Sequence, residues 1–250
     1  MTLVANMNVG VIPRSIRLRV FPVFWRIYSK VKAPHSEYSV SGKTIRLHTA
    51  TPAECKVITN TFNSERDVLI DFVNNLRPDD VFYDIGANVG QYSCLAGISG
   101  ADVIAFDPHP RNTNRIRDNL DINGIDGKVV EAALSDTDGE LGFDVSEDDA
   151  GADQGELDEY GQFTVKTYRG DTYVNQSISP SVLKIDVEGA EMSVLQGFGD
   201  GLHVLRLIYV ERHFNKMDED PDAILELLHD AGFETHTVAD RGAQDMIRAE

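Results

Sequence analysis

The stretch VFYDIGANVGQYS, residues 81–93, decides the fold. It opens with a short, largely apolar run that contains one acid, Asp84, and such a run predicts a buried strand. Gly86 and Gly90 follow, and glycines permit the sharp turn that carries a strand into a helix. Because cofactors in open α/β sheets bind at this carboxyl edge, the sequence predicts a cofactor site at the turn.

The chemistry of the turn indicates which cofactor it binds. A dinucleotide-binding turn reads G-x-G-x-x-G and directs backbone amides at a pyrophosphate, whereas this turn reads D-x-G-A-N-x-G. A carboxylate on the approach suits a cationic ligand without phosphate, such as S-adenosylmethionine. A nicotinamide-dependent oxidoreductase is therefore the weaker alternative. The cofactor contacts expected from this stretch are Asp84, Gly86, Ala87, Asn88, Gly90, Tyr92 and Ser93.

The next two predicted strands extend the cofactor site. A strand over 102–106 is followed by Asp107 and Pro108, and a carboxylate at that point can accept the ribose hydroxyls. The alternative role for Asp107 is a cap on the helix that starts near Pro110. A third strand, over 128–134, leads into a stretch that we expect to border the adenine, with Ala133 as a contact.

Strands and helices alternate through the rest of the chain. This alternation with short links predicts an α/β fold with a doubly wound, mostly parallel sheet of seven strands. A hairpin over 39–47 and a helix capped by Ser64 precede the sheet. The remaining strands are expected over 182–185, 205–210, 233–238 and 245–248, and the remaining helices over 89–98, 110–123, 189–196 and 221–229.

The segment VLKIDVEGAE, residues 182–191, contains candidate catalytic residues. Lys184 and Asp186 are two apart on a predicted strand, so their side chains share a face. A buried pair of charges is costly, which favours a role for it in function. Asp186 is also expected beside the cofactor turn. Glu191 is explained equally well by a functional role and by a favourable place at the start of the next helix.

The segment IYVERH, residues 208–213, ends the fifth strand with polar residues at the same edge. Glu211 and His213 would adjoin the crevice that holds the cofactor, where a histidine can transfer protons. The alternative is a local ion pair of Glu211 with Arg212 or Lys216.

The chain resembles the FkbM-type methyltransferase family in five segments that occur in this order: VFYDIGANVGQYS, VIAFDPHPRN, VVEAALSDTDG, VLKIDVEGAEMSVLQG and YVERH. The resemblance covers about residues 64–235. It implies the Rossmann-like class I methyltransferase fold. It also implies an S-adenosylmethionine-dependent enzyme that O-methylates a hydroxyl of a sugar, a glycan or a natural product. Asp107 stands where the family more often has glutamate, so the carboxylate is kept.

Methyl transfer to a hydroxyl needs a group that removes the proton. We expect His213 to be the base and Asp186 to orient it, with Glu211 and Lys184 completing the catalytic set. Asp84 is expected at the amino acid end of the cofactor. Asp186, Glu211 and His213 could instead bind a divalent metal ion, but no metal is predicted. The alternative to an enzyme is a non-catalytic accessory protein that keeps the fold.

The composition narrows the environment and the partners. With 41 acidic and 23 basic residues, the net charge of −18 argues against nucleic acid as a partner. Cys55 and Cys94 lack metal-type spacing, and so few cysteines indicate a reducing cytoplasm. We interpret the acidic excess as adaptation to a salt-rich cytosol, and the alternative is an ordinary acidic enzyme.

Residues 1–36 differ from the rest, because they contain no acidic residue but several arginines and lysines among apolar residues. We expect a basic, amphipathic helical extension, followed by a methyltransferase domain over 37–250. The extension either packs on the acidic body or, through residues 11–32, contacts a membrane surface or a partner. Its pattern is not that of a signal peptide. The acidic stretch over 144–159 is expected to be a solvated loop between two β segments.

Overall fold

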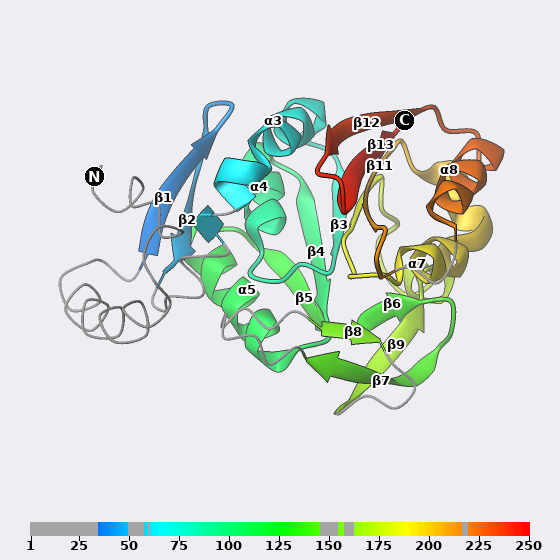
Figure 1. Ribbon diagram of the computed structural model, residues 1–250. Helices are drawn as coiled ribbons and strands as arrows, with labels where there is room; N and C mark the ends of the chain where they lie inside the picture. Colours follow the sequence, from blue (N-terminus) through cyan, green and yellow to red (C-terminus); the bar gives the residue numbers. More distant parts are fainter. Residues whose placement is uncertain (1–34, 50–57, 60, 146–154, 158–162, 217–219) are drawn as a thin grey trace, which may run out of the picture.

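A seven-stranded sheet forms the centre of the molecule in the computed structural model, which describes residues 35–49, 58–59, 61–145, 155–157, 163–216 and 220–250 (Figure 1). β13 runs antiparallel to both of its neighbours, and the other pairings within this sheet are parallel. This confirms the predicted α/β fold with a mostly parallel sheet. The strand order is β12 (Thr235–Asp240), β13 (Gln244–Ala249), β11 (Leu207–His213), β10 (Val182–Ile185), β3 (Val81–Ile85), β4 (Asp102–Asp107) and β5 (Gly127–Glu131).

Helices cover both faces of the sheet (Figure 1). Side chains of successive strand residues point to opposite faces, so Phe82 joins one buried apolar cluster and Tyr83 joins the other. The first cluster includes residues of α3 (Arg66–Asn75), α4 (Gln91–Ser99) and α5 (Pro110–Ile122). The second includes residues of α6 (Gly170–Val174), α7 (Glu191–Phe198), the short 3₁₀ helix η2 (Gly199–Val204) and α8 (Pro221–Asp230). The sheet is therefore doubly wound, as predicted.

The predicted third strand is wrong in extent, because the chain changes sheets at Ala132. β5 ends at Glu131, which pairs with Asp107 at the end of β4. Pro108 follows and cannot donate to a ladder, so β5 has no strand to pair with beyond that point. The next residues enter a second sheet, which consists of β6 (Ala133–Ser135), β9 (Phe163–Arg169), β7 (Gly139–Val145) and β8 (Gly155–Leu157).

The prediction of a solvated loop over 144–159 is wrong at residues 155–157, which form the strand β8. β8 lies within it and pairs antiparallel with β7, which places Leu157 opposite Phe143. The rest of this stretch, over 146–154 and 158–159, lies outside the described residues.

The predicted hairpin is confirmed as β1 (His35–Val40) and β2 (Lys43–His48), which turn at Ser41 and Gly42. The side-chain amides of Asn119, in α5, and Asn123, just after it, bond backbone groups of β2 that a third strand would otherwise satisfy. Asn123 accepts from the backbone N–H of Arg46 at 2.8 Å and donates to its carbonyl oxygen at 2.7 Å. Asn119 accepts from the N–H of His48 at 2.8 Å.

The predicted cap at Ser64 is wrong. Residues 61–64 are already helical, so Ser64 lies within a helical turn and Glu65 occupies the position before α3. Within the described residues, no helix has the length and apolar character needed to cross a membrane. The predicted extension lies outside the described residues up to position 34, and with it the membrane contact proposed for 11–32.

Candidate active site

The turn after β3 needs glycine at residue 86 for two reasons. Gly86 has a φ of +77°, which side-chain-bearing residues rarely adopt. A Cβ at this position would also overlap the backbone carbonyl oxygen of Asp186, at the end of β10. The glycine therefore lets the cofactor turn and the end of the neighbouring strand approach each other closely.

A pocket lies beside this turn and brings together six of the predicted cofactor residues: Gly86, Asn88, Asp107, Pro108, Ala133 and Asp186. Its walls also contain apolar side chains that suit a flat aromatic ring, and Phe143 among them comes from β7 of the second sheet. The residues that complete the pocket are Ile85, Phe106, Asn112, Ala132, Leu134, Phe143, Val187 and Glu188.

Asp107 lies on the pocket wall with its carboxylate held by its own turn. It accepts from the backbone N–H of Asn88 and of His109, each at 2.9 Å, and from the side-chain amide of Asn112 at 3.2 Å. Burial raises the pKa of Asp107 to about 7, although these donors oppose the rise. The cap of α5 is His109, whose ring accepts from the N–H of Arg111, so the alternative role of Asp107 as that cap is wrong.

The structure places Asp84 beneath the turn and away from the pocket wall. Its side chain is fully buried and accepts a hydrogen bond of 2.6 Å from the Ser93 hydroxyl. Burial raises the pKa of Asp84, and the nearby Lys184 ammonium partly offsets the rise. Within the described residues, Ala87, Gly90, Tyr92 and Ser93 also do not line the pocket. For these five residues, direct contact with the cofactor stays a prediction.

Lys184 and Asp186 form the predicted ion pair, in which the lysine is buried and the aspartate side chain is 28% exposed. The Lys184 Nζ lies 3.0 Å from a carboxylate oxygen of Asp186, 3.9 Å from one of Asp84, and 4.7 Å from the centre of the Tyr92 ring. Burial alone would lower the pKa of Lys184, but the charges of Asp186 and Asp84 outweigh it and raise the pKa. Burial opposes ionisation of Asp186 too, yet Lys184 and His213 hold its pKa below the usual value. Both groups are therefore charged.

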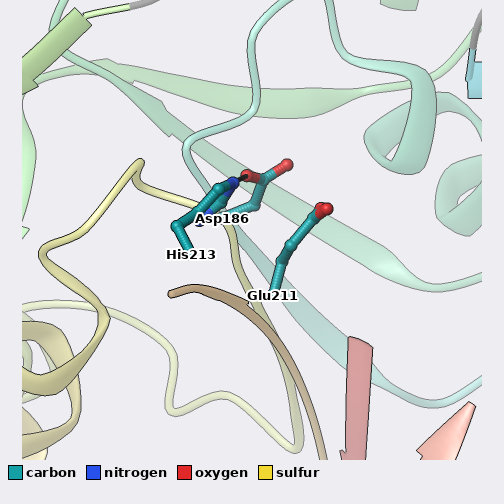
Figure 2. Close-up of side chains that lie close together, drawn as sticks. All are labelled: Asp186, Glu211 and His213. Atoms are coloured by element: carbon teal, nitrogen blue, oxygen red, sulfur yellow. Dashed lines mark ion pairs between the residues drawn. The ribbon is translucent and has the colours of Figure 1, made fainter. Parts of the chain in front are cut away.

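His213 ends β11 and is surrounded by carboxylates. Its Nδ1 lies 2.7 Å from Oε1 of Glu191, while its Nε2 lies 3.5 Å from Glu188 and 3.8 Å from Asp186. Figure 2 shows the His213 ring and the Asp186 carboxylate pointing toward each other. Burial would lower the pKa of His213, but the hydrogen bond to Glu191 and the charges of Asp186 and Glu188 raise it to about 9.

Glu211 faces the same cluster and pairs with an arginine that is distant in the sequence. Its carboxylate lies 3.1 Å from Arg241 and accepts from the side-chain amide of Gln244. Burial raises the pKa of Glu211 to about 8, and the charge of Asp186 adds to the rise. The alternative pairing of Glu211 with neighbouring cations is wrong, because Arg212 binds Asp245 at 2.6 Å and Lys216 binds Glu188 at 2.9 Å.

Comparison with known proteins identifies the protein family of this chain. Residues 84–235 match the family described as the Methyltransferase FkbM domain. The chain belongs to the FkbM methyltransferase family. It is therefore an S-adenosylmethionine-dependent methyltransferase, and the resemblance of its five segments is confirmed.

Three known methyltransferases are similar in sequence to this FkbM methyltransferase. Hexuronic acid methyltransferase AglP of Haloferax volcanii is 30% identical over 212 residues, which cover 83% of this chain and 85% of AglP. 2-O-methyltransferase NoeI of Sinorhizobium fredii is 30% identical over 177 residues, covering 61% of this chain and 72% of NoeI. 31-O-demethyl-FK506 methyltransferase FkbM of Streptomyces tacrolimicus is 38% identical over 63 residues, 24% of each chain.

Sequence reasoning missed two residues of this FkbM methyltransferase site. Glu65 precedes α3 and accepts from the Tyr92 hydroxyl at 3.0 Å. Arg241, in the turn between β12 and β13, lies 3.4 Å from Glu65 and 3.1 Å from Glu211. Neither residue stands in a recognisable motif, and only the fold brings both to the end of β11.

Proposed function

We propose that this FkbM methyltransferase transfers a methyl group to a hydroxyl oxygen of a sugar, with a hexuronic acid as the first candidate acceptor. The observation that carries the proposal is the position of His213 beside Asp186 and Glu188, which line the cofactor pocket, with Nε2 making no hydrogen bond within the described residues. The names of the relatives AglP and NoeI support a carbohydrate acceptor.

The pocket fits the adenosine part of S-adenosylmethionine, which when bound supplies the methyl group on a positively charged sulfur. Asp107 would hold the ribose, since its carboxylate lies on the wall and can accept hydroxyl protons. Ala133, Phe106 and Phe143 would enclose the adenine. Because Asp84 lies beneath the turn, we assign the cationic end of the cofactor to Asp186, which lines the pocket and stays ionised.

His213 in its neutral form would take the acceptor's hydroxyl proton at Nε2. Asp186 faces that nitrogen at 3.8 Å and can stabilise the imidazolium that results. Lys184 in turn keeps Asp186 ionised, because its Nζ lies 3.0 Å from a carboxylate oxygen of Asp186. The three side chains thus divide the roles of base, electrostatic partner and support.

A metal ion is the alternative for this cluster, because ligand atoms of Asp186, Glu211 and His213 all lie within 4.8 Å of one another. Both carboxylates already have a cationic neighbour, Lys184 for Asp186 and Arg241 for Glu211. These cations oppose the entry of a divalent ion, so we assign proton removal to the side chains. Treatment with EDTA should then leave turnover unchanged.

The test begins with calorimetric titration of S-adenosylmethionine and then follows labelled methyl transfer to hexuronic acid saccharides, at low salt and in molar KCl. We expect His213→Gln to keep cofactor affinity while kcat falls by roughly 10²- to 10⁴-fold. Mild alkali distinguishes the products, because it cleaves a methyl ester and leaves a methyl ether intact. An ester product would overturn the hydroxyl acceptor, and binding without turnover would indicate an accessory protein.

A further inference from the structure

The side chain of Glu191 joins the start of α7 to the end of β11. Its Oε1 lies 2.7 Å from Nδ1 of His213 and accepts from the backbone N–H of Gly189 at 3.1 Å. Glu191 is 0% exposed, and its Oε2 has no hydrogen-bond partner within the described residues. The carboxylate is therefore directed at the histidine ring from inside the protein.

We propose that Glu191 is a positioning residue for His213, holding the proton of the neutral ring on Nδ1 and leaving Nε2 free to face the crevice between Asp186 and Glu188. The proposal rests on the proposed function, in which Nε2 removes a proton from the acceptor. Glu191 acts through His213 and has no place on the pocket wall.

A place at a helix start does not by itself account for Glu191. An acidic residue favours the first turn of a helix even when it is exposed to solvent, whereas this carboxylate is buried, which is costly without a specific partner. The cap position of α7 is Ala190, so Glu191 is the first residue of the helix and not its cap. The bonds that it does make go to His213 and to the turn before the helix.

The turn before α7 is built to bring Glu191 to this position. Glu188 has a φ of +58°, an uncommon conformation for a residue with a side chain. Gly189 has a φ of +115°, and a Cβ there would lie 2.7 Å from the carbonyl oxygen of Lys216. Strained backbone of this kind gathers at functional sites. Here it packs the turn against the segment that follows His213.

The charged groups around His213 come from each neighbouring element. Asp186 follows β10, Glu188 lies in the turn, and Glu191 begins α7. Lys216 binds Glu188 at 2.9 Å, and Lys184 binds Asp186 at 3.0 Å. Both carboxylates on the Nε2 side therefore have a lysine partner, while Glu191 on the Nδ1 side has none within the described residues. Its Oε1 bonds the ring of His213 and the backbone N–H of Gly189.

The decisive variant is Glu191→Gln, which keeps the size of the side chain and removes its charge. We expect kcat to fall by roughly 10²- to 10⁴-fold, by analogy with the loss of a carboxylate partner from a catalytic histidine. The affinity for S-adenosylmethionine should change less than about threefold, because Glu191 does not line the pocket. The acid limb of the pH–rate profile should move to lower pH. Glu191→Asp should recover part of kcat, and Glu226→Gln on the exposed side of α8 is the matched control.

¹⁵N NMR of the His213 ring tests the proposal directly, in the unmodified enzyme and in the Glu191→Gln variant. In the neutral ring of His213 the proton should reside on Nδ1, and Glu191→Gln should lower the pH at which the ring titrates. A proton on Nε2, or a titration unchanged in the variant, would overturn the proposal. A variant that loses cofactor affinity and stability together with kcat would show a structural role instead. An enzyme with no methyl transfer would contradict the proposed function, and the NMR result would still test the pair.

Discussion

Gly86 and the backbone carbonyl oxygen of Asp186 approach so closely that a Cβ on residue 86 would overlap that oxygen. The same strand ends are joined by a hydrogen bond of 3.0 Å from the N–H of Asp186 to the carbonyl of Ile85. The turn that faces the cofactor and the acid that faces His213 are therefore fixed to each other. A change at the glycine should affect both parts of the site.

Gly86→Ala should lower the free energy of unfolding more than Gly42→Ala does. The two glycines have nearly the same φ, +77° and +78°, but a Cβ on Gly42 would meet nothing within 4 Å. Gly42→Ala should cost about 1–2 kcal/mol, the strain of a left-handed conformation. Gly86→Ala adds the overlap with Asp186 and should also weaken cofactor binding. Urea unfolding and calorimetry measure both effects, and equal losses in the two variants would show that the close approach is relieved cheaply.

Lys184→Met should destabilise the protein by about 3–5 kcal/mol, because it leaves the buried carboxylate of Asp84 and the partly buried carboxylate of Asp186 without their shared cation. The pKa of Asp186 should rise at the same time. Lys216→Met is the control, since that lysine is 43% exposed and its pairing with Glu188 should contribute at most about 1 kcal/mol. Chemical denaturation distinguishes the two variants, and similar losses would contradict a supporting role for Lys184.

The sequence predicted strand boundaries best where chemistry changes abruptly. β3 matches the strand predicted at the start of the stretch 81–93, and β10 matches the predicted range 182–185, because a glycine turn or an acid follows each apolar run. The run over 128–134 contains no glycine or acid at Ala132, so the sequence does not indicate that β5 ends and β6 begins there. The change of sheet follows from the end of β4 at Asp107, just before Pro108, and this depends on pairing between distant segments.

The site was predictable where residues follow strands of the parallel sheet. Asp107 and Asp186 reach the same pocket because carboxyl ends of parallel strands share one edge. Asp84 belongs to the same pattern, yet its side chain points under the turn, and only packing around Ser93 and Lys184 decides that. Arg241 reaches the cluster through the antiparallel β12–β13 turn, which no motif marks.

Asp107→Asn should weaken binding of S-adenosylmethionine by roughly 10- to 100-fold, the value of a hydrogen bond to a charged group. Since burial raises the pKa of Asp107 to about 7, affinity in the unmodified enzyme should also weaken as the pH falls below 7. The variant should lose this dependence. Asp102→Asn, at the exposed opposite end of β4, should leave affinity unchanged. Calorimetry at pH 6 and pH 8 measures both effects. An affinity that depends neither on pH nor on Asp107 would contradict the assignment of Asp107 to the ribose.

The rate of methyl transfer should rise with pH up to about 9. The carboxylates of Glu191, Asp186 and Glu188 raise the pKa of His213 to about 9, so the ring is protonated at neutral pH, and kcat/KM should increase close to tenfold per pH unit until the base is neutral. The free energy of unfolding should fall over the same pH range in which the rate rises. A raised histidine pKa stabilises the folded state fully below the unfolded value near 6.5, and this contribution is lost as the pH rises through about 9.

Glu211 titrates in the same window, because burial raises its pKa to about 8. Its ionisation adds a negative charge to the cluster, so Glu211→Gln should move the limb of the rate profile to lower pH without removing it. His213→Gln should remove the limb altogether. A rate that is flat or falling between pH 7 and 9 in the unmodified enzyme would exclude His213 as the base, because a base with a pKa of about 9 requires the rate to rise across that range.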